Sequence, residues 1–270
     1  QAEDGIRDVE RSRGLGDVYK RQYINPEIVR EFLYEQSKKV TGKTQGRAIS
    51  TLRSFYNFLV LEKIAENNPI EDIDYPKIDS KVPFVLSTNE IDKIILQASL
   101  TKFGTRNQTM IEVMYSCGLR VSEVIEMKIS NIFFDESLIK VMGKGKKERF
   151  VPLSGIAKKL LCNYIECERK ESKFDKQSVD IVFLNNRGGK LSRIMVYNII
   201  NDAALAAEIT SKISPHTLRH SFATHLIENG ADIISIQKMM GHENIVTTEK
   251  YLNVNKKHLV ETVIKYHPRK

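Results

Sequence analysis

The stretch around residue 216 places a histidine and an arginine where a helix should begin. Ser214 and Pro215 form a pair typical of a helix start, a capping side chain followed by a first-turn proline. His216 and Arg219, three residues apart, would then share one face beside unpartnered main-chain N–H groups. Because a helix N-terminus favours anions, this arrangement predicts a phosphate-binding site. On its own, the stretch could equally be an ordinary solvated helix start.

A second arginine lies in the stretch Gly118-Leu119-Arg120-Val121-Ser122-Glu123, which begins a helix after a glycine. The planar guanidinium of Arg120 can hold a phosphate through two hydrogen bonds. Glu123 lies three residues on, so it could orient Arg120 from behind, or form only a surface ion pair with it.

Two further stretches would complete such a site. The basic turn Gly143-Lys144-Gly145-Lys146 lies at the tip of a predicted hairpin, and its lysines could reach into a DNA groove or simply face solvent. Gly241-His242 is followed nine residues later by Tyr251. A lone tyrosine that ends a helix is usually a half-buried core residue, so this stretch gains weight only beside the others.

Taken together and in this order, the stretches resemble the tyrosine recombinases, the phage integrase family, and most closely the bacterial Xer recombinases of the XerD-like type. The resemblance extends from Tyr23 to the end and is carried by GLRVSE at 118–123, GKGKKERFVPL at 143–153, HTLRHSFATHL at 216–226, GHENIVTTEKYLNV at 241–254 and HPRK at 267–270. Carried over by position, it implies a catalytic set of Arg120, Lys144, His216, Arg219, His242 and Tyr251, with Glu123 supporting Arg120.

The resemblance implies a reaction in which Tyr251 attacks a DNA phosphodiester. A 3′-phosphotyrosyl intermediate and a free 5′-hydroxyl result, and the 5′-hydroxyl of a partner strand then reverses the step. The bond energy is kept in the covalent intermediate, so ATP is not needed. A tyrosine hydroxyl has a pKa of about 10 and needs activation, for which His216 is the candidate proton acceptor.

The remaining members of the implied set would handle charge. Arg120 and Arg219 would hold the non-bridging oxygens of the transition state, and His242 would donate another hydrogen bond. Lys144 would protonate the leaving 5′-oxygen. Since the sequence offers no cluster of carboxylates to bind a metal ion, we expect neither a metal nor any other cofactor.

The composition favours an anionic partner and a reducing compartment. A formal charge of +8 is typical of proteins that bind nucleic acid. Lys43, Arg47, Arg53 and Lys146 are candidate contacts to double-stranded DNA, although a solvated basic face is the alternative. The odd number of cysteines, three, lacks metal-ligand spacing and predicts reduced thiols. With no long apolar run and no signal sequence, the expected location is the cytoplasm, away from membranes.

Apolar periodicity and capping signals predict a mainly α fold with a small β-sheet. A helical core-binding domain would span residues 23–80, a linker residues 75–87 and a mixed α/β catalytic domain residues 88–270, closing around DNA as a two-domain C-shaped clamp. The expected helices are 26–39, 44–64, a helix capped by Ser87 and Glu90, 105–117, 120–128, 155–170, 192–207, 214–229, 232–240, 244–252 and 255–264. The expected hairpin pairs 138–142 with 149–153.

The first 22 residues read differently from the rest of the chain. They lack apolar periodicity, and their back-translation resembles sequencing-library adapters, with residues 9–11 as an index. We therefore expect residues 1–22 to be an artefact and the helical domain to be truncated at its start.

The resemblance implies site-specific recombination, with chromosome dimers resolved by a tetramer that includes a paralogous, XerC-like partner. Residues 255–264 would dock on a neighbouring protomer, as this helix does within the family. Three alternatives stay open: the integrase of a mobile element with the same chemistry, a DNA-binding relative without catalysis, and a type IB topoisomerase. The full set of six catalytic residues argues against the second, and the shortness of the chain against the third.

Overall fold

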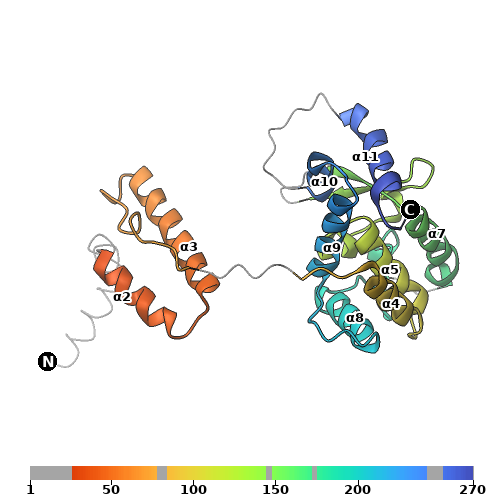
Figure 1. Ribbon diagram of the computed structural model, residues 1–270, viewed down its shortest axis with the longest axis horizontal. Helices are drawn as coiled ribbons and strands as arrows, with labels where there is room; N and C mark the ends of the chain where they lie inside the picture. The colour runs from red at the N-terminus through yellow and green to blue at the C-terminus, as the bar shows by residue number, and fades with distance from the viewer. Residues whose placement is uncertain (1–25, 78–83, 144–147, 172–174, 242–251, 270) are drawn as a thin grey trace. The chain divides into compact units, whose positions relative to one another are not determined.

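The computed structural model describes residues 26–77, 84–143, 148–171, 175–241 and 252–269, and only the backbone of residues 252–257. It divides into two compact units, Gln1–Val82 and Pro83–Lys270 (Figure 1). The adapter-like residues 1–22 lie outside the described part, as do Lys144, Lys146, His242 and Tyr251. Within the described part, no helix is long and apolar enough to cross a membrane.

The described part of the first unit contains two predicted helices, α2 (Pro26–Ser37) and α3 (Gly42–Leu61). Thr41 caps α3 by accepting a hydrogen bond from the main-chain N–H of Thr44. α3 ends short of the predicted residue 64, and Lys63 just beyond it takes a left-handed φ of 58° that a continuing helix cannot accommodate. The small core is made of Val29, Leu33, Ile49, Tyr56, Leu59, Ile70 and Ile73.

The second unit combines helices with one antiparallel sheet of strand order β1-β2-β3. Its α-helices are α4 (Thr88–Ser99), α5 (Gly104–Ser116), α6 (Val121–Ile125), α7 (Gly155–Tyr164), α8 (Arg193–Ala206), α9 (Pro215–Glu228), α10 (Ile233–Met240) and α11 (Leu252–Tyr266). Its strands are β1 (Ile132–Phe133), β2 (Leu138–Met142) and β3 (Glu148–Pro152). The prediction of a mainly α fold with a small sheet is confirmed. The closing of two domains into a clamp stays a prediction.

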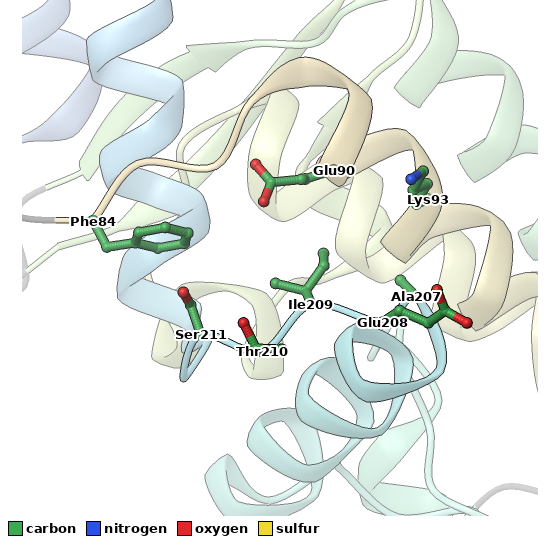
Figure 2. A pocket seen from close by; sticks show the side chains of 8 residues that line it. All are labelled: Phe84, Glu90, Lys93, Ala207, Glu208, Ile209, Thr210 and Ser211. Carbon is green, nitrogen blue, oxygen red and sulfur yellow. The ribbon is translucent and has the colours of Figure 1, made fainter.

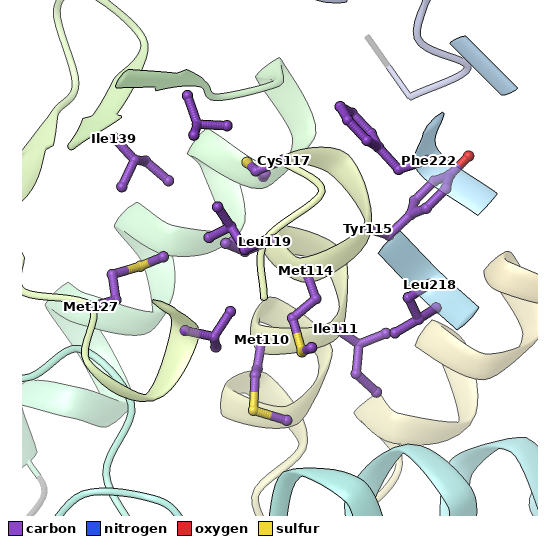
Figure 3. Close-up of a cluster of buried hydrophobic side chains, with 14 of the residues drawn as sticks. Met110, Ile111, Met114, Tyr115, Cys117, Leu119, Met127, Ile139, Leu218 and Phe222 are labelled. Carbon is purple, nitrogen blue, oxygen red and sulfur yellow. The ribbon is translucent and has the colours of Figure 1, made fainter. Parts of the chain in front are cut away.

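α5 runs through the centre of the second unit and is buried along nearly its whole length. Its core side chains include Ile111, Met114 and Tyr115, and Leu218 and Phe222 of α9 belong to the same cluster (Figure 3). This packing fixes α9 against the end of α5, where the chain turns into α6. Two elements that carry predicted site residues, α6 and α9, are thereby held by one core.

The predicted hairpin is confirmed, with Leu138 paired to Pro152 and Val141 to Arg149. β1 extends it to three strands and was not predicted. The predicted helix over residues 120–128 was wrong at its C-terminal end, because α6 stops at Ile125. The main chain beyond it pairs elsewhere, and the Met127 carbonyl accepts a hydrogen bond of 2.9 Å from the N–H of Val182.

The last helix packs on its own second unit. Leu259 and Val263 of α11 are buried in the core that α5 organises, whereas Ile264 is 58% exposed. α10, α11 and β3 contact one another and lie together at one end of the unit, opposite α8 (Figure 1). The docking of residues 255–264 on a neighbouring protomer therefore stays a prediction, and it would require α11 to leave this core.

Candidate functional site: an arginine cluster around Glu123

Arg120 stands directly before α6 and is bound to Glu123 in two ways. Its main-chain N–H donates to Glu123 Oε2 at 2.8 Å, and its Nη1 donates to Oε1 at 3.0 Å. The Glu123 side chain is 2% exposed and that of Arg120 31%, so the guanidinium keeps one side toward solvent. Gly118 lets the chain turn from α5 into α6 close to α9, because it adopts a φ of 57° and a Cβ there would collide with the Phe222 ring. The contact between Arg120 and Glu123 is thus present, and the role of Glu123 in supporting Arg120 for catalysis stays a prediction.

Arg219 reaches the same carboxylate from α9. Ser214 caps this helix as predicted, accepting from the Thr217 N–H, with Pro215 in the first turn. Arg219 donates to the carbonyls of Gly118 and Met240, and its Nη1 lies 3.9 Å from Glu123 Oε2. The structure thus brings together the two arginines that the sequence predicted for phosphate binding, although they come from elements about one hundred residues apart.

Arg149 of β3 is a third member, and the sequence reasoning assigned it no role. Its Nη1 and Nη2 donate to the two oxygens of Glu123 at 2.7 and 2.9 Å, and its Nε donates to the Met239 carbonyl at 2.8 Å. A signal was present in the strand pattern. Side chains two residues apart in a strand share a face, and Val151 is fully buried, so Arg149 had to point toward the core side.

Positive groups outnumber negative ones in this cluster of Arg120, Arg149, Arg219 and Glu123. Burial by itself would raise the pKa of Glu123, but the hydrogen bonds and charges of Arg149 and Arg120 outweigh it, and the pKa is lowered. Glu123 is therefore an anion, and three guanidiniums face it. Burial lowers the pKa of Arg219 to about 10, and repulsion from Arg120 adds to the effect. A cluster with surplus positive charge and one solvent-facing arginine can bind an additional anion.

The other predicted catalytic residues fall in two groups. His216 is exposed in the first turn of α9, on the helix that carries Arg219. Lys144, His242 and Tyr251 lie outside the described residues, but the neighbour of one of them is in place. Gly241 ends α10 with a left-handed φ of 62°, and its carbonyl accepts from Arg120 Nη2 at 3.1 Å. Gly241, the last described residue before His242, therefore lies at the arginine cluster.

The predicted DNA contacts of the first unit are placed differently from one another. Lys43 and Arg47 are exposed on α3. Arg53 is half-buried and donates to the carbonyls of Ile70, Glu71 and Ile73, and its guanidinium lies 4.8 Å from the centre of the Tyr75 ring. Arg53 thus holds the segment that follows α3, a use that sequence reasoning did not foresee.

A shallow pocket elsewhere in the second unit contains none of the predicted site residues. Phe84, Glu90 and Lys93 line one side, and residues 207–211 line the other (Figure 2). In the described ranges, no three His, Cys, Asp or Glu side chains gather as a metal site would require.

The arginine cluster lies in the part of the chain that matches a known family. Residues 85–258 match the model of the phage integrase family. This chain belongs to the phage integrase family. It is a tyrosine site-specific recombinase, and the resemblance drawn from its motifs is confirmed.

Curated relatives cover most of the chain. Tyrosine recombinase XerD of Oceanobacillus iheyensis is 43% identical over 242 residues, which span 88% of this chain and 80% of the relative. Tyrosine recombinase XerC of Anoxybacillus flavithermus is 40% identical over 255 residues, spanning 93% of this chain and 85% of the relative.

Solved structures agree on the fold. The XerA recombinase is 30% identical with a TM-score of 0.56, covering 92% of this chain and 85% of that chain. XerH bound to its difH substrate in a pre-cleavage complex is 22% identical with a TM-score of 0.66, covering 86% and 70%. The Tn1549 transposon integrase in complex with transposon right end DNA is 16% identical with a TM-score of 0.71, covering 94% and 93%.

Proposed function

We propose that the arginine cluster is the active site for DNA strand cleavage. Arg120 and Arg219 bind the non-bridging oxygens of one DNA phosphate, and Glu123 holds both guanidiniums in place. The observation that carries the proposal is the convergence of three guanidiniums on one buried carboxylate, with the pKa of Arg219 lowered to about 10. A bound phosphodiester would relieve the surplus charge, and its transition state, which carries more negative charge, would relieve it further.

The chemical step assigns a role to each remaining member of the predicted set. The Tyr251 oxygen attacks phosphorus, the bond from phosphorus to the 5′-oxygen breaks, and a 3′-phosphotyrosyl ester forms. His216 accepts the phenol proton, and Lys144 delivers a proton to the leaving 5′-oxygen. His242 donates a hydrogen bond to the phosphate. Religation runs the same steps in reverse with the 5′-hydroxyl of another strand, so no external energy source is needed.

We propose a biological setting by analogy with the relatives. The names XerC and XerD favour chromosome dimer resolution with a paralogous recombinase. We place this reaction in the cytoplasm, in a synapse of four protomers. Integration of a mobile element is the second candidate, and the fold match to the Tn1549 transposon integrase is the observation in its favour. Lys43, Arg47 and Lys146 are proposed as DNA phosphate contacts, and binding should weaken steeply with salt.

A suicide substrate tests the proposal. Duplexes that the protein captures covalently are first selected from a random pool, and a nick is then placed beside the cleavage point so that the cut fragment diffuses away. The parent chain should form an SDS-resistant complex in EDTA, and Tyr251→Phe should bind the duplex without forming it. Peptide mapping should find the nucleotide on Tyr251. A covalent complex with Tyr251→Phe, or a strict need for divalent metal, would refute the proposal.

A further inference from the structure

The end of α10 is tied to the arginine cluster by three successive carbonyl groups. The carbonyl of Met239 accepts from Arg149, that of Met240 from Arg219 and that of Gly241 from Arg120. Carbonyls at a helix C-terminus carry partial negative charge and favour cations. Each arginine therefore joins Glu123 to a different residue of the same helix end, from which the segment with His242 continues.

Arg149 differs from the other two arginines in how it uses its donors. Its two terminal nitrogens both bind Glu123, at 2.7 and 2.9 Å, and its Nε binds Met239. The side chain is only 13% exposed, against 31% for Arg120. Glu123 Oε1 accepts from both Arg149 and Arg120. Arg149 therefore fixes the position of the carboxylate to which Arg120 is bound.

The C-terminal end of α10 also packs directly against the aliphatic part of the Arg149 side chain. A Cβ on Gly241 would lie 3.2 Å from Arg149 Cδ and Nε, closer than most Cβ contacts, so the left-handed turn at Gly241 lies directly against this side chain. Replacing Arg149 by a shorter side chain would open space under the turn and leave the Met239 carbonyl without this donor. The buried Glu123 would lose two of its charge-assisted hydrogen bonds.

We propose that Arg149 is a positioning residue for strand cleavage. It locks Glu123 to the C-terminal end of α10, so that Arg120 and Arg219 face the phosphate together. Arg149 itself does not contact DNA or the reacting atoms. This inference rests on the proposed function, because it assigns Arg149 a part in that same reaction.

The test measures single-turnover covalent cleavage and DNA affinity separately, with the full chain and the suicide duplex. Arg149→Gln should cleave about 100-fold more slowly, the cost of a small misplacement of reacting groups, while its Kd for the duplex changes less than about threefold. Arg149→Lys keeps the charge but cannot bind both carboxylate oxygens and the Met239 carbonyl, so cleavage should fall about tenfold.

A pH profile separates positioning from general loss of structure. With Arg149 replaced by glutamine, burial of Glu123 is opposed by Arg120 but no longer by Arg149, so its pKa should be higher than in the parent. Cleavage by Arg149→Gln should therefore drop more steeply than that of the parent as the pH is lowered. Adding Glu123→Gln to Arg149→Gln should abolish this extra slope and cost less than the product of the two single losses.

Arg169→Gln is the matched control. Arg169 is a buried arginine of the same unit that donates to the carbonyls of Ser178, Val179 and Ile181. Its replacement should lower the melting temperature but leave the cleavage rate of folded protein and its pH profile unchanged. If Arg149→Gln does not fold, Arg149→Lys decides the question alone.

Three results would overturn the inference: parental cleavage by Arg149→Gln or, where that variant does not fold, by Arg149→Lys; a loss equally large in DNA affinity; or a pH profile that matches the parent. Tyr251→Phe and Arg120→Gln are run beside them. If those two still cleave, the proposed function has failed. If they do not cleave and Arg149→Gln does so at the parental rate, only the positioning role has failed.

Discussion

Two buried glutamates in the second unit, Glu123 and Glu112, both pair with arginines, but the balance of charge around them is opposite. Glu123 is approached by three guanidiniums, from Arg120, Arg149 and Arg219. Glu112 of α5, fully buried, lies 2.7 Å from Arg269 Nη2, and the other terminal nitrogen of Arg269 pairs with Asp92. One cluster therefore has more positive groups than carboxylates, and the other has more carboxylates than positive groups.

This difference in charge distinguishes the cluster around Glu123, a candidate binding site, from the cluster of Glu112, Asp92 and Arg269, which we call the anchor because it ties the last residues to α4 and α5. The arginine partners lower the pKa of Glu123, whereas burial raises the pKa of Glu112 to about 7, although the Ser116 hydroxyl that donates to it acts in the opposite direction. Arg269 is occupied by two carboxylates and ties the chain end to α4 and α5. The surplus charge around Glu123 is left for a ligand, so residue type alone does not identify an anion site, but the balance of charges does.

The largest expected effect is on cleavage. Arg219→Gln removes a guanidinium from the cluster with surplus charge, so single-turnover covalent cleavage should fall by roughly 10³ or more, by analogy with arginines that stabilise phosphoryl transfer. Quenched-flow or hand-mixed assays on the suicide duplex give the rate, and circular dichroism checks the fold. A loss below about tenfold would mean that this arginine only supports the fold.

The anchor should respond to pH instead. His267 is fully buried beside the rings of Tyr115 and Phe222, and burial lowers its pKa to about 4. A histidine with a lowered folded pKa takes up its proton mainly on unfolding, so His267 should lower the stability by up to about 3 kcal/mol as the pH drops from about 6.5 toward 4. Glu112, whose pKa is raised, opposes this fall, so the His267 contribution is the difference between the parent and a His267 variant. Urea unfolding across this range measures it. His267→Gln should remove this part of the acid sensitivity, and an unchanged pH dependence would contradict the assignment.

A smaller effect tests the same distinction in the first unit. Arg53 donates its N–H groups to main-chain carbonyls, whereas Arg47 of the same helix is exposed. Arg53→Gln should destabilise the first unit by about 1–2 kcal/mol, and Arg47→Gln should leave stability unchanged but lower the salt dependence of DNA binding by about one unit of slope. Thermal melts and binding titrations at several salt concentrations compare the two. Interchanged results would show that internal hydrogen bonds do not distinguish anchors from DNA contacts.

The sequence predicted those features of the arginine cluster and its helices that depend on residues within four positions of each other. The Ser214 cap and the pairing of Arg120 with Glu123 depend on side chains one helical turn apart, so their types and spacing suffice. The capping box of Ser87 and Glu90 was predictable for the same reason.

The rest depends on contacts between distant segments. Arg149 binds Glu123 and Met239, 26 and 90 residues away, and only the packing of β3 against α10 makes these contacts possible. The early end of α6 has a similar origin, because the main chain after it pairs with residues near 181. Arg53 looked like Arg47 in the sequence because both are basic residues of one helix, and only the folded segment around Ile70 distinguishes them.

The most direct test of the charge argument uses a substrate with less charge. In a suicide duplex whose scissile phosphate is replaced by a methylphosphonate, the cleaved linkage is neutral, so the need for two guanidiniums should fall. We predict that Arg219→Gln, slowed roughly 10³-fold on the phosphate, is slowed about tenfold or less on the methylphosphonate relative to the parent chain. An equal loss on the two substrates would show that Arg219 does not act on the charge of the phosphate, and would contradict the assignment of this cluster as the cleavage site.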